Sequence, residues 1–238
     1  MEGQVVLNIA HRGASGRFPE NTLRSFSAAL AAGADMCELD VRATRDGHLV
    51  VLHDASVDRT TEGRGQLETM TLEQVKRLDA GIKFGGEFAG ERIPALAEVF
   101  DLTIGHCGLN LELKAEGIER AVCELVCERA AVGSTLVSAF DWAAIGRVRD
   151  YAPEVRVALL ASRRPAQLLT AAIEMKAAAI APRADLVSAE LCTAAHRHAI
   201  DVYAWTVDEP AAMRKLIGDG VDGITTNFPE RLAEVTGR

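Results

Sequence analysis

Short apolar runs rich in β-branched residues recur along the chain, and most are separated by stretches of helical period. The runs have the length of buried strands, whereas the stretches between them repeat apolar positions every three to four residues. Strands that alternate with helices over 238 residues favour a parallel sheet closed into a TIM-like (β/α)8 barrel. The predicted strands are 5–10, 36–41, 49–53, 109–114, 134–140, 155–161, 178–183, 201–207 and 221–227, and the predicted helices are 22–32, 117–131, 142–150, 165–176, 188–199 and 209–219.

The run 49–53 is one strand more than an eight-stranded barrel needs. Only the stretch RATRDGH separates it from the run before, which is far shorter than a parallel crossover connection. Asp46-Gly47 is a favoured pair for a two-residue hairpin turn. We therefore predict that 49–53 pairs antiparallel with 36–41, in a register that places Arg42 opposite Val51 and Asp40 opposite His53.

Segment 54–98 departs from the alternation of strands and helices. It is rich in Gly, Thr and charged residues and is too long for an ordinary connection. It holds one clear helix signal, with Thr71 as N-cap and Gly81 as the stop. We predict a small insertion over the barrel mouth, after the hairpin of the second strand and within a single barrel domain of residues 1–238. A disordered loop is the alternative.

Acidic residues stand near the C-terminal ends of two predicted strands. Glu38 and Asp40 are two residues apart, so they project from one side of the strand, and Glu112 and Lys114 share the same spacing. Converging carboxylates repel one another, and a hard divalent cation bound through oxygen removes that conflict. All-oxygen ligands indicate Mg²⁺, Ca²⁺ or Mn²⁺ rather than zinc. From spacing alone, a structural ion pair between Glu38 and an arginine is equally open.

Two histidines end predicted strands at the same mouth of the barrel. His11 follows the first strand and His53 closes the hairpin, and together they can supply a general base and a general acid near neutral pH. Arg12 and Lys114 can hold an anion, and Asn21 or Thr22 caps a helix that starts just after the first strand. Two histidines, two cations and a divalent metal are what phosphoryl transfer between oxygens requires.

The charge balance limits the class of partner. The chain carries 26 Lys and Arg against 34 Asp and Glu, a net charge of −8, which argues against nucleic acid or an anionic membrane surface. No apolar stretch is long enough to span a bilayer, and the first residues lack the pattern of a signal peptide. Five cysteines, an odd number, fit reduced thiols and a cytoplasmic protein. The basic stretch SRRP at 162–165 is interpreted as a solvated loop.

Six fragments in order resemble the glycerophosphodiester phosphodiesterase family. They are HRGASGRFPENTLRSF, ELDVRATRDGHLVVLHDASVDRTTEGRG, LDAG with FAGERIPAL, LELK, AWTVDEP and DGITTNFPE, and the likeness runs from about residue 8 to the end. The resemblance implies a TIM-like barrel with an insertion. It also implies metal-dependent hydrolysis of small glycerophosphodiesters, such as glycerophosphocholine, to sn-glycerol 3-phosphate and an alcohol.

The resemblance also assigns roles by position. His11 and His53 become the acid/base pair, and one divalent metal ion is bound by the three acids. The remaining assignments are Arg12 and Lys114 as phosphate ligands and Trp205 as an apolar wall of the substrate pocket.

Tyr203 stands where many relatives carry a smaller polar residue, which would change the shape of that pocket. Arg183 and Asp208 end strands on the same face and are weaker pocket candidates. The metal-binding acids are Glu38, Asp40 and Glu112.

Two other functions remain open for the same barrel. A lysophospholipase D-like phosphodiesterase would be favoured by an apolar surface around the insertion. A catalytically inactive binding module would have lost a histidine or a metal-binding acid, and all five are present. A phosphosugar isomerase or aldolase would show a glycine-rich phosphate loop after the late strands, which DGITTNFPE does not.

Overall fold

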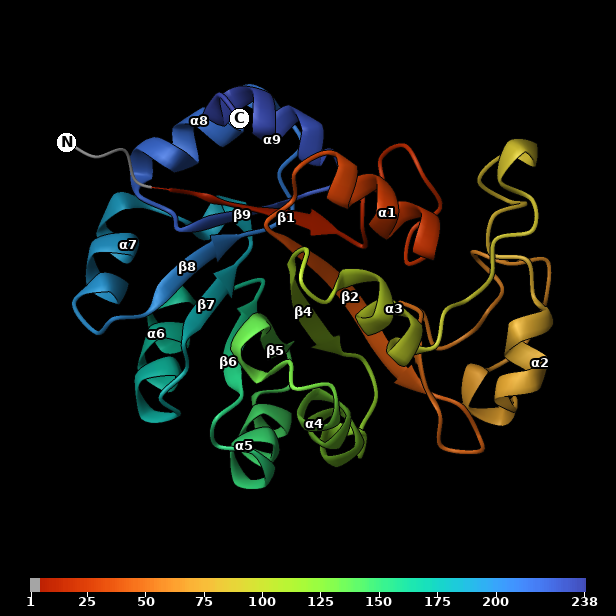
Figure 1. The fold of residues 1–238 in the computed structure, drawn as a ribbon. Coiled ribbons are helices and arrows are strands. Elements are labelled where there is room, and N and C mark those ends of the chain that lie inside the picture. The colour runs from red at the N-terminus through yellow and green to blue at the C-terminus, as the bar shows by residue number, and fades with distance from the viewer. Residues whose placement is uncertain (1–4) are drawn as a thin grey trace.

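The computed structural model describes residues 5–238, apart from the side chain of Pro165. Eight parallel strands close into a barrel, because the first of them in the chain pairs with both the second and the last (Figure 1). One additional strand, which directly follows the second in the chain, pairs antiparallel with it. The TIM-like barrel expected from the alternating pattern is therefore confirmed. The strands are β1 (Leu7–His11), β2 (Met36–Ala43), β3 (Leu49–Val51), β4 (Gly108–Leu113), β5 (Thr135–Ala139), β6 (Arg156–Ala161), β7 (Ala179–Pro182), β8 (Asp201–Ala204) and β9 (Gly223–Thr226).

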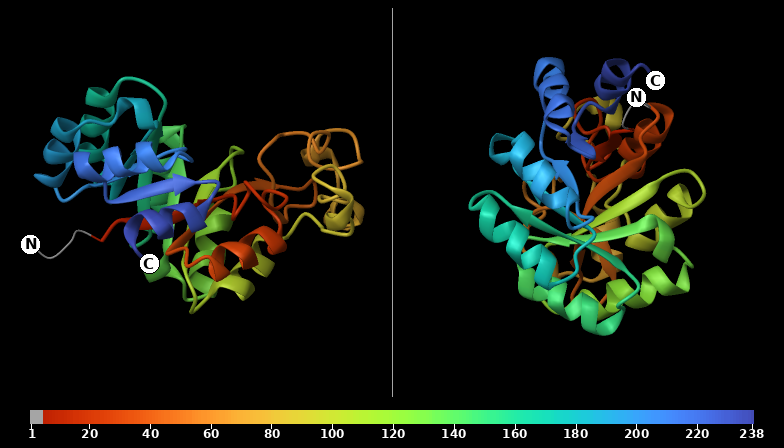
Figure 2. Two further views of the ribbon diagram at one scale, coloured as in Figure 1. Left: turned by 90° about the horizontal axis from the view of Figure 1, so that it is seen from above. Right: turned by 90° about the vertical axis from the view of Figure 1, so that its left-hand side faces the viewer.

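Helices surround the barrel and cover the outer faces of its strands (Figures 1 and 2). All six helices predicted between the barrel strands form, as does the helix predicted within the insertion, and two more occur at 96–103 and 229–236, which the apolar pattern did not single out. The helices are α1 (Leu23–Ala31), α2 (Leu72–Arg77), α3 (Leu96–Thr103), α4 (Glu119–Glu128), α5 (Trp142–Tyr151), α6 (Pro165–Glu174), α7 (Ala189–His196), α8 (Pro210–Asp219) and α9 (Pro229–Thr236).

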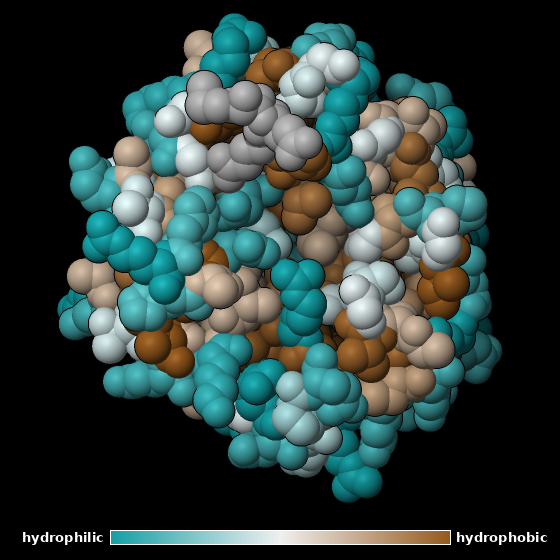
Figure 3. All heavy atoms as spheres, turned by 60° about the vertical axis from the view of Figure 1, so that its left-hand side comes forward, coloured by the Kyte–Doolittle hydropathy of each residue, from teal (hydrophilic) through white to brown (hydrophobic). Residues whose placement is uncertain are grey.

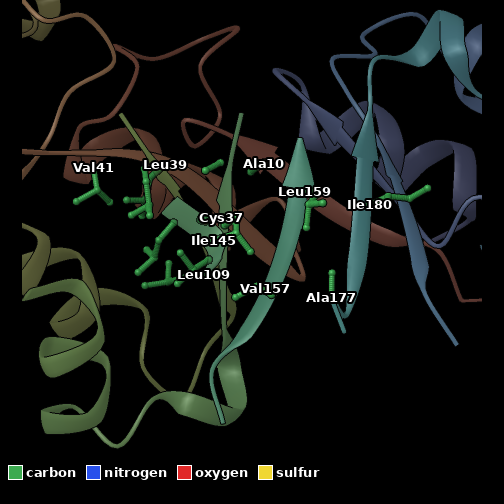
Figure 4. Packing of buried hydrophobic residues seen from close by; sticks show 14 of the residues in the cluster. Ala10, Cys37, Leu39, Val41, Leu109, Ile145, Val157, Leu159, Ala177 and Ile180 are labelled. Atoms are coloured by element: carbon green, nitrogen blue, oxygen red, sulfur yellow. The ribbon is translucent and has the colours of Figure 1, made fainter. Parts of the chain in front are cut away.

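The apolar residues separate into an outer and an inner cluster because strand side chains alternate between two faces. The larger cluster lies between the strands and the helices, and Figure 4 shows part of it, with Leu39 of β2, Leu159 of β6 and Ile145 of α5. A smaller cluster inside the barrel includes Ile9 and Leu136. On the face drawn in Figure 3, brown apolar residues form small groups separated by teal polar ones. None of the helices formed by residues 5–238 combines the length and apolar content needed to cross a bilayer.

The hairpin after β2 forms as predicted, but its register is shifted by one residue. Val41, not Arg42, stands opposite Val51, and the Leu52 N–H donates to the Asp40 carbonyl, so His53 is not directly opposite Asp40. The turn has three residues, 45–47, rather than two. A two-residue type I′ turn needs positive φ at both central residues, and Gly47 has φ 82° while Asp46 does not share it. The Asp46 carboxylate is instead held by Thr44 Oγ1 and the Leu72 N–H.

The predicted insertion, residues 54–98, projects from the barrel at the end away from the N-terminus (Figure 2, orange to yellow). It has an apolar cluster of its own, which includes Leu67, Val75 and Ile93. Its last residues enter α3, which packs against α1 and β3. These contacts support the proposal of an ordered insertion within one barrel domain.

Helix α2 within the insertion begins as predicted but ends early. The Thr71 hydroxyl caps it by accepting from the Gln74 N–H, and the Gln74 side chain accepts from the Thr71 N–H in return. The helix stops at Arg77 and not at Gly81. Gly81 has a different role, because a Cβ there would lie 1.9 Å from the Phe88 carbonyl oxygen. The chain needs glycine at this point for a close approach of backbone to backbone.

Candidate active site

A cavity of about 300 Å³ opens at the C-terminal ends of the barrel strands. This end of a parallel barrel carries the loops that follow the strands, and it is where such barrels place their active sites. Seven of the eight predicted site residues line the cavity, and the eighth, Asp40, is fully buried beside them. The lining residues are His11, Arg12, Glu38, His53, Asn110, Glu112, Lys114, Ser138, Phe140, Leu160, Ala181, Tyr203, Trp205, Thr206 and Thr225.

The three predicted metal-binding acids converge. Glu38 and Asp40 of β2 and Glu112 of β4 each offer a carboxylate oxygen, and these oxygens lie within 4.8 Å of one another. Parallel pairing explains the convergence, because Asp40 stands opposite Glu112 in the register of β2 and β4. Burial and the neighbouring carboxylates raise the pKa of Glu38 well above its usual value. Burial raises the pKa of Glu112 as well, against the opposing effect of the Lys114 ammonium.

The cations of the site neutralise only part of this acidic cluster. Lys114 Nζ lies 2.5 Å from Glu112 Oε1 and 3.4 Å from Asp40 Oδ1, and Arg12 Nε lies 3.2 Å from Asp40 Oδ2. Glu38 receives only the backbone N–H of Arg12, at 3.0 Å, so the ion pair of Glu38 with an arginine side chain is absent from the described residues. Buried Glu38 Oε1 has no hydrogen-bond donor within residues 5–238. Three carboxylates against two cations leave an all-oxygen cluster that fits a hard divalent ion.

His11 is held in one orientation by a chain of hydrogen bonds from the loops after β8 and β9. Asn227 Oδ1 lies 2.7 Å from His11 Nδ1, and Asn227 Nδ2 donates to Asp208 Oδ2 at 2.7 Å. Because a carboxylate only accepts, the amide must turn its NH₂ to Asp208 and its oxygen to His11. His11 Nδ1 therefore carries the proton, and Nε2 presents its lone pair on the side of Glu38, 3.9 Å away. Burial and the charge of Arg12 lower the pKa of His11.

His53 has a matching arrangement from the start of the insertion. Its Nδ1 lies 2.6 Å from Asp54 Oδ1, and Arg59 Nε donates to Asp54 Oδ2 at 2.6 Å. These contacts lower the pKa of Asp54 to about 2, chiefly through the Arg59 hydrogen bond. Asp54 is thus an acceptor at neutral pH, so His53 donates from Nδ1 and keeps Nε2 for a ligand. Arg59 also contacts Glu20, which in turn contacts Arg12.

Local backbone structure places the remaining polar groups. Thr22, not Asn21, caps α1 by accepting from the Ser25 N–H. Asn21 instead adopts φ 58° and donates from Nδ2 to Asp40 Oδ2 at 2.8 Å, which satisfies that buried oxygen.

One wall of the cavity is aromatic. Trp205 Nε1 donates to the Ala181 carbonyl at 2.7 Å, and the ring meets Phe140 edge to face with centroids 5.5 Å apart. Tyr203 also lines the cavity, and its hydroxyl donates to Asp201, which is not one of the three predicted metal-binding acids. Of the weaker candidates, Arg183 pairs with Asp185 and does not line the cavity, while Asp208 acts through Asn227.

Three side chains hold the predicted residues in place: Asn227 and Asp54, which sequence reasoning missed, and Asn21, which it considered only as a helix cap. Each stands within a fragment that we quoted, either just after a strand or at a helix start. No feature of their spacing distinguishes a hydrogen bond to a catalytic side chain from an ordinary turn residue. The contact between Asn227 and His11 joins residues 216 positions apart, so it follows only from barrel closure.

Comparison with known proteins agrees with this geometry. Residues 11–231 match the model of the glycerophosphoryl diester phosphodiesterase family. The chain belongs to this family. It is 42% identical over 233 residues to a glycerophosphodiester phosphodiesterase of Caldanaerobacter subterraneus subsp. tengcongensis, covering 95% of this chain and 96% of that protein. The resemblance seen in the six sequence fragments is confirmed.

Solved structures of family members share the fold along the whole barrel. A glycerophosphoryl diester phosphodiesterase from Silicibacter pomeroyi, described as putative, superposes with a TM-score of 0.89 at 30% identity and covers 98% of this chain and 93% of its own. A phosphodiesterase from Oleispira antarctica, solved in complex with the product sn-glycerol-3-phosphate, gives a TM-score of 0.89 at 29% identity, with coverage of 97% and 96%.

Proposed function

We propose that this protein hydrolyses glycerophosphodiesters to sn-glycerol 3-phosphate and an alcohol, with a divalent metal ion and two histidines. The observation that carries the proposal is the cavity whose lining includes His11 and His53, each held through Nδ1, together with Glu38 and Glu112 of the three-acid cluster. The family match and the product complex of the Oleispira relative support the substrate class. The substrate is a small molecule, since the net charge of −8 disfavours a polyanionic partner.

Phosphodiester hydrolysis needs one group to take a proton and another to give one. One histidine accepts the proton of the attacking hydroxyl at Nε2, a P–O bond forms, and the other protonates the leaving alcohol as its P–O bond breaks. The attacking hydroxyl belongs either to the glycerol of the substrate or to water. Attack by glycerol yields a cyclic phosphate that water then opens, and the histidines exchange roles. Detection of a cyclic glycerophosphate distinguishes the two routes.

The charge balance of the site supports a divalent ion held by Glu38, Asp40 and Glu112. Bound there, Mg²⁺, Ca²⁺ or Mn²⁺ would neutralise phosphate charge and polarise the P–O bonds. Three acids, two cations, a divalent ion and one phosphodiester anion together carry no net charge. The same set without the ion leaves two negative charges, so substrate and ion would bind cooperatively.

Arg12 and Lys114 would bind the phosphate by charge. Both already contact Asp40, so the acids orient them toward the cavity. Trp205 would form the apolar wall against the carbon atoms of the substrate, with Phe140 beside it.

A direct assay tests the function. Glycerophosphocholine is incubated with the protein, and choline and sn-glycerol 3-phosphate are measured with and without EDTA. We expect both products, no turnover in EDTA, and recovery on adding Mg²⁺, Ca²⁺ or Mn²⁺. Absence of turnover with every divalent ion would favour an inactive binding module. Full turnover after exhaustive chelation would remove the metal from the proposal.

A second candidate substrate is a lysophospholipid, because apolar residues are exposed on the insertion. Ile82 is 42% and Phe84 47% exposed, and Phe84 contacts Phe88 edge to face. Such a surface could hold an acyl chain beside the barrel mouth. Choline release from lysophosphatidylcholine that exceeds release from glycerophosphocholine would favour this candidate.

The thiols support a cytoplasmic location. All five cysteines are free, and the sulfurs of Cys37 and Cys107 lie 3.8 Å apart without a covalent bond. Free thiols persist in a reducing compartment. Fractionation of the native host, with detection of the protein by antibody, tests the location.

A further inference from the structure

A second cavity adjoins the candidate active site at the C-terminal ends of β5 and β6. It has a volume of about 540 Å³, and Phe140 and Leu160 line both this cavity and the one that contains the histidines. The two spaces therefore meet at these side chains. A substrate whose phosphate lies near Lys114 can extend one substituent past Phe140, because Lys114 Nζ lies 5.7 Å from the centre of that ring.

The charge of this second cavity is positive and unbalanced. Arg163 and Arg164 line it, and its lining includes no carboxylate. No acid in residues 5–238 forms an ion pair with either arginine, although other arginines near this end of the barrel are paired. Arg147 contacts Glu119, and Arg183 contacts Asp185 through two hydrogen bonds.

A third cavity that also touches Phe140 provides a contrast. It is lined by Glu112, Glu116 and Asp141 together with Lys114 and Arg147. Lys114 contacts Glu112, and Arg147 contacts Asp141, so its charges are largely neutralised internally. Of the two spaces beside the active site, only the one with Arg163 and Arg164 offers positive charge to a ligand.

Helix α6 adds to this positive charge. Arg164 is its N-cap residue and Gln167 lies in its first turn, and both line the cavity. The first backbone N–H groups of a helix have no partner within the helix, and the helix dipole is positive at this end. The Trp142 indole N–H is already donated to the Leu160 carbonyl, so Trp142 supplies apolar area.

We propose that this cavity binds a second anionic group, a phosphate or carboxylate carried by the alcohol part of the substrate. The proposal rests on the function proposed above and narrows it to glycerophosphodiesters with an acidic head group. The protein as a whole, with its net charge of −8, would repel a substrate that carries two anionic groups, so the local positive charge decides its binding. The stretch SRRP at 162–165, which we interpreted from the sequence as a solvated loop, would thus bind the head group of the substrate.

The test compares two substrates that differ by one phosphate, glycerophosphoinositol and glycerophosphoinositol 4-phosphate. For the wild-type protein we expect kcat/KM to be about tenfold or more higher for the phosphorylated substrate, since hydrogen bonds to charged groups are the strong ones. In the double variant Arg163→Gln/Arg164→Gln this preference should disappear, mainly through KM. Turnover of glycerophosphocholine should stay within about twofold, which also shows that the variant is folded.

A matched control separates a binding site from the general field of the protein. Arg197→Gln/Arg214→Gln removes two exposed arginines from α8 and the end of α7, neither of which lines the cavity. The control should keep the wild-type preference. An equal loss in the control, or a preference that survives in Arg163→Gln/Arg164→Gln, overturns the subsite. A wild-type protein that prefers the unphosphorylated substrate also overturns it. If sn-glycerol 3-phosphate is released from none of glycerophosphocholine, glycerophosphoinositol and glycerophosphoinositol 4-phosphate, the proposed function itself is overturned.

Discussion

Replacing Glu38 by glutamine should abolish activity and yet stabilise the metal-free protein. Glu38, Asp40 and Glu112 place oxygens within 4.8 Å of one another. Two carboxylate charges at that separation repel by about 3.5 kcal/mol at an effective dielectric constant of about 20. Glu38 meets two such neighbours, and the charges of Arg12 and Lys114 offset much of the repulsion. We estimate a net gain of about 2 kcal/mol in the free energy of unfolding for Glu38→Gln.

Thermal unfolding in EDTA at neutral pH measures this gain. For a chain of this length about 2 kcal/mol corresponds to a rise in Tm of about 4 to 8 °C. We expect divalent ions to raise the Tm of the wild type further, and the variant should lose this rise because it lacks one of the three proposed ligands. Glu128→Gln, an exposed glutamate without an ion pair among the described residues, serves as the control and should leave Tm within about 1 °C.

The pH dependence provides an independent check of the same reasoning. A carboxyl whose pKa is raised by folding keeps its proton longer in the folded state, so stability falls as the pH rises from the unfolded pKa of about 4.3 through the folded pKa. The raised pKa of Glu38 predicts that the metal-free wild type gains stability on mild acidification from neutral pH. Glu38→Gln should show less of this gain. A lower Tm for Glu38→Gln in EDTA would refute the argument that the acids repel one another.

Three further predictions test other parts of the structure. His11→Ala and His53→Ala should each lower kcat by about 10² to 10⁴ with the circular dichroism spectrum unchanged, and near wild-type kcat in either variant would contradict the two-histidine mechanism. Asn227→Leu should lower kcat more than it changes KM, because it frees the ring of His11 without touching the phosphate ligands; an unchanged kcat would show that this hydrogen bond does not orient the ring. Gly81→Ala should lower the free energy of unfolding by about 1 to 3 kcal/mol, because the added Cβ would clash with the Phe88 carbonyl oxygen. The control Gly86→Ala, whose added Cβ would enter open space, should leave the free energy of unfolding nearly unchanged. Equal Tm values for the two variants would refute this prediction.

The barrel could be predicted because its strands and helices follow local rules. Alternating apolar runs and helical stretches determine their own secondary structure, and parallel strands then bring Glu38 and Glu112 to the same end whatever the details of the loops. The predicted register of the hairpin was wrong by one residue, because the register of a hairpin depends on the number of residues in its turn. Asp46 keeps an ordinary φ while accepting hydrogen bonds from Thr44 and Leu72, and the contact with Leu72 comes from the distant start of α2.

The side chains that hold the proposed catalytic residues in place could not be predicted for a related reason. His11 and His53 can be recognised from the sequence as titratable side chains at strand ends. Asn227 and Asp54 act only through their contacts with these two histidines. Helix α9 escaped the apolar pattern because few of its residues are buried, Pro229 and Leu232 among them. Its position depends on barrel closure, where Asn8 Nδ2 donates to the Pro229 carbonyl across 221 residues.

The chain of ion pairs from Arg12 through Glu20 and Arg59 to Asp54 has a consequence for exchanging the insertion between relatives. Asp54 and Arg59 are covalently part of the insertion, but through Glu20 they are fastened to the loop after β1. A graft that begins at residue 54 would carry away the acceptor that orients His53. A graft that begins after Arg59 would leave that acceptor in place. The boundary for building chimaeras therefore lies a few residues inside the insertion, because an insertion exchanged beyond Arg59 leaves the contact between His53 and Asp54 intact.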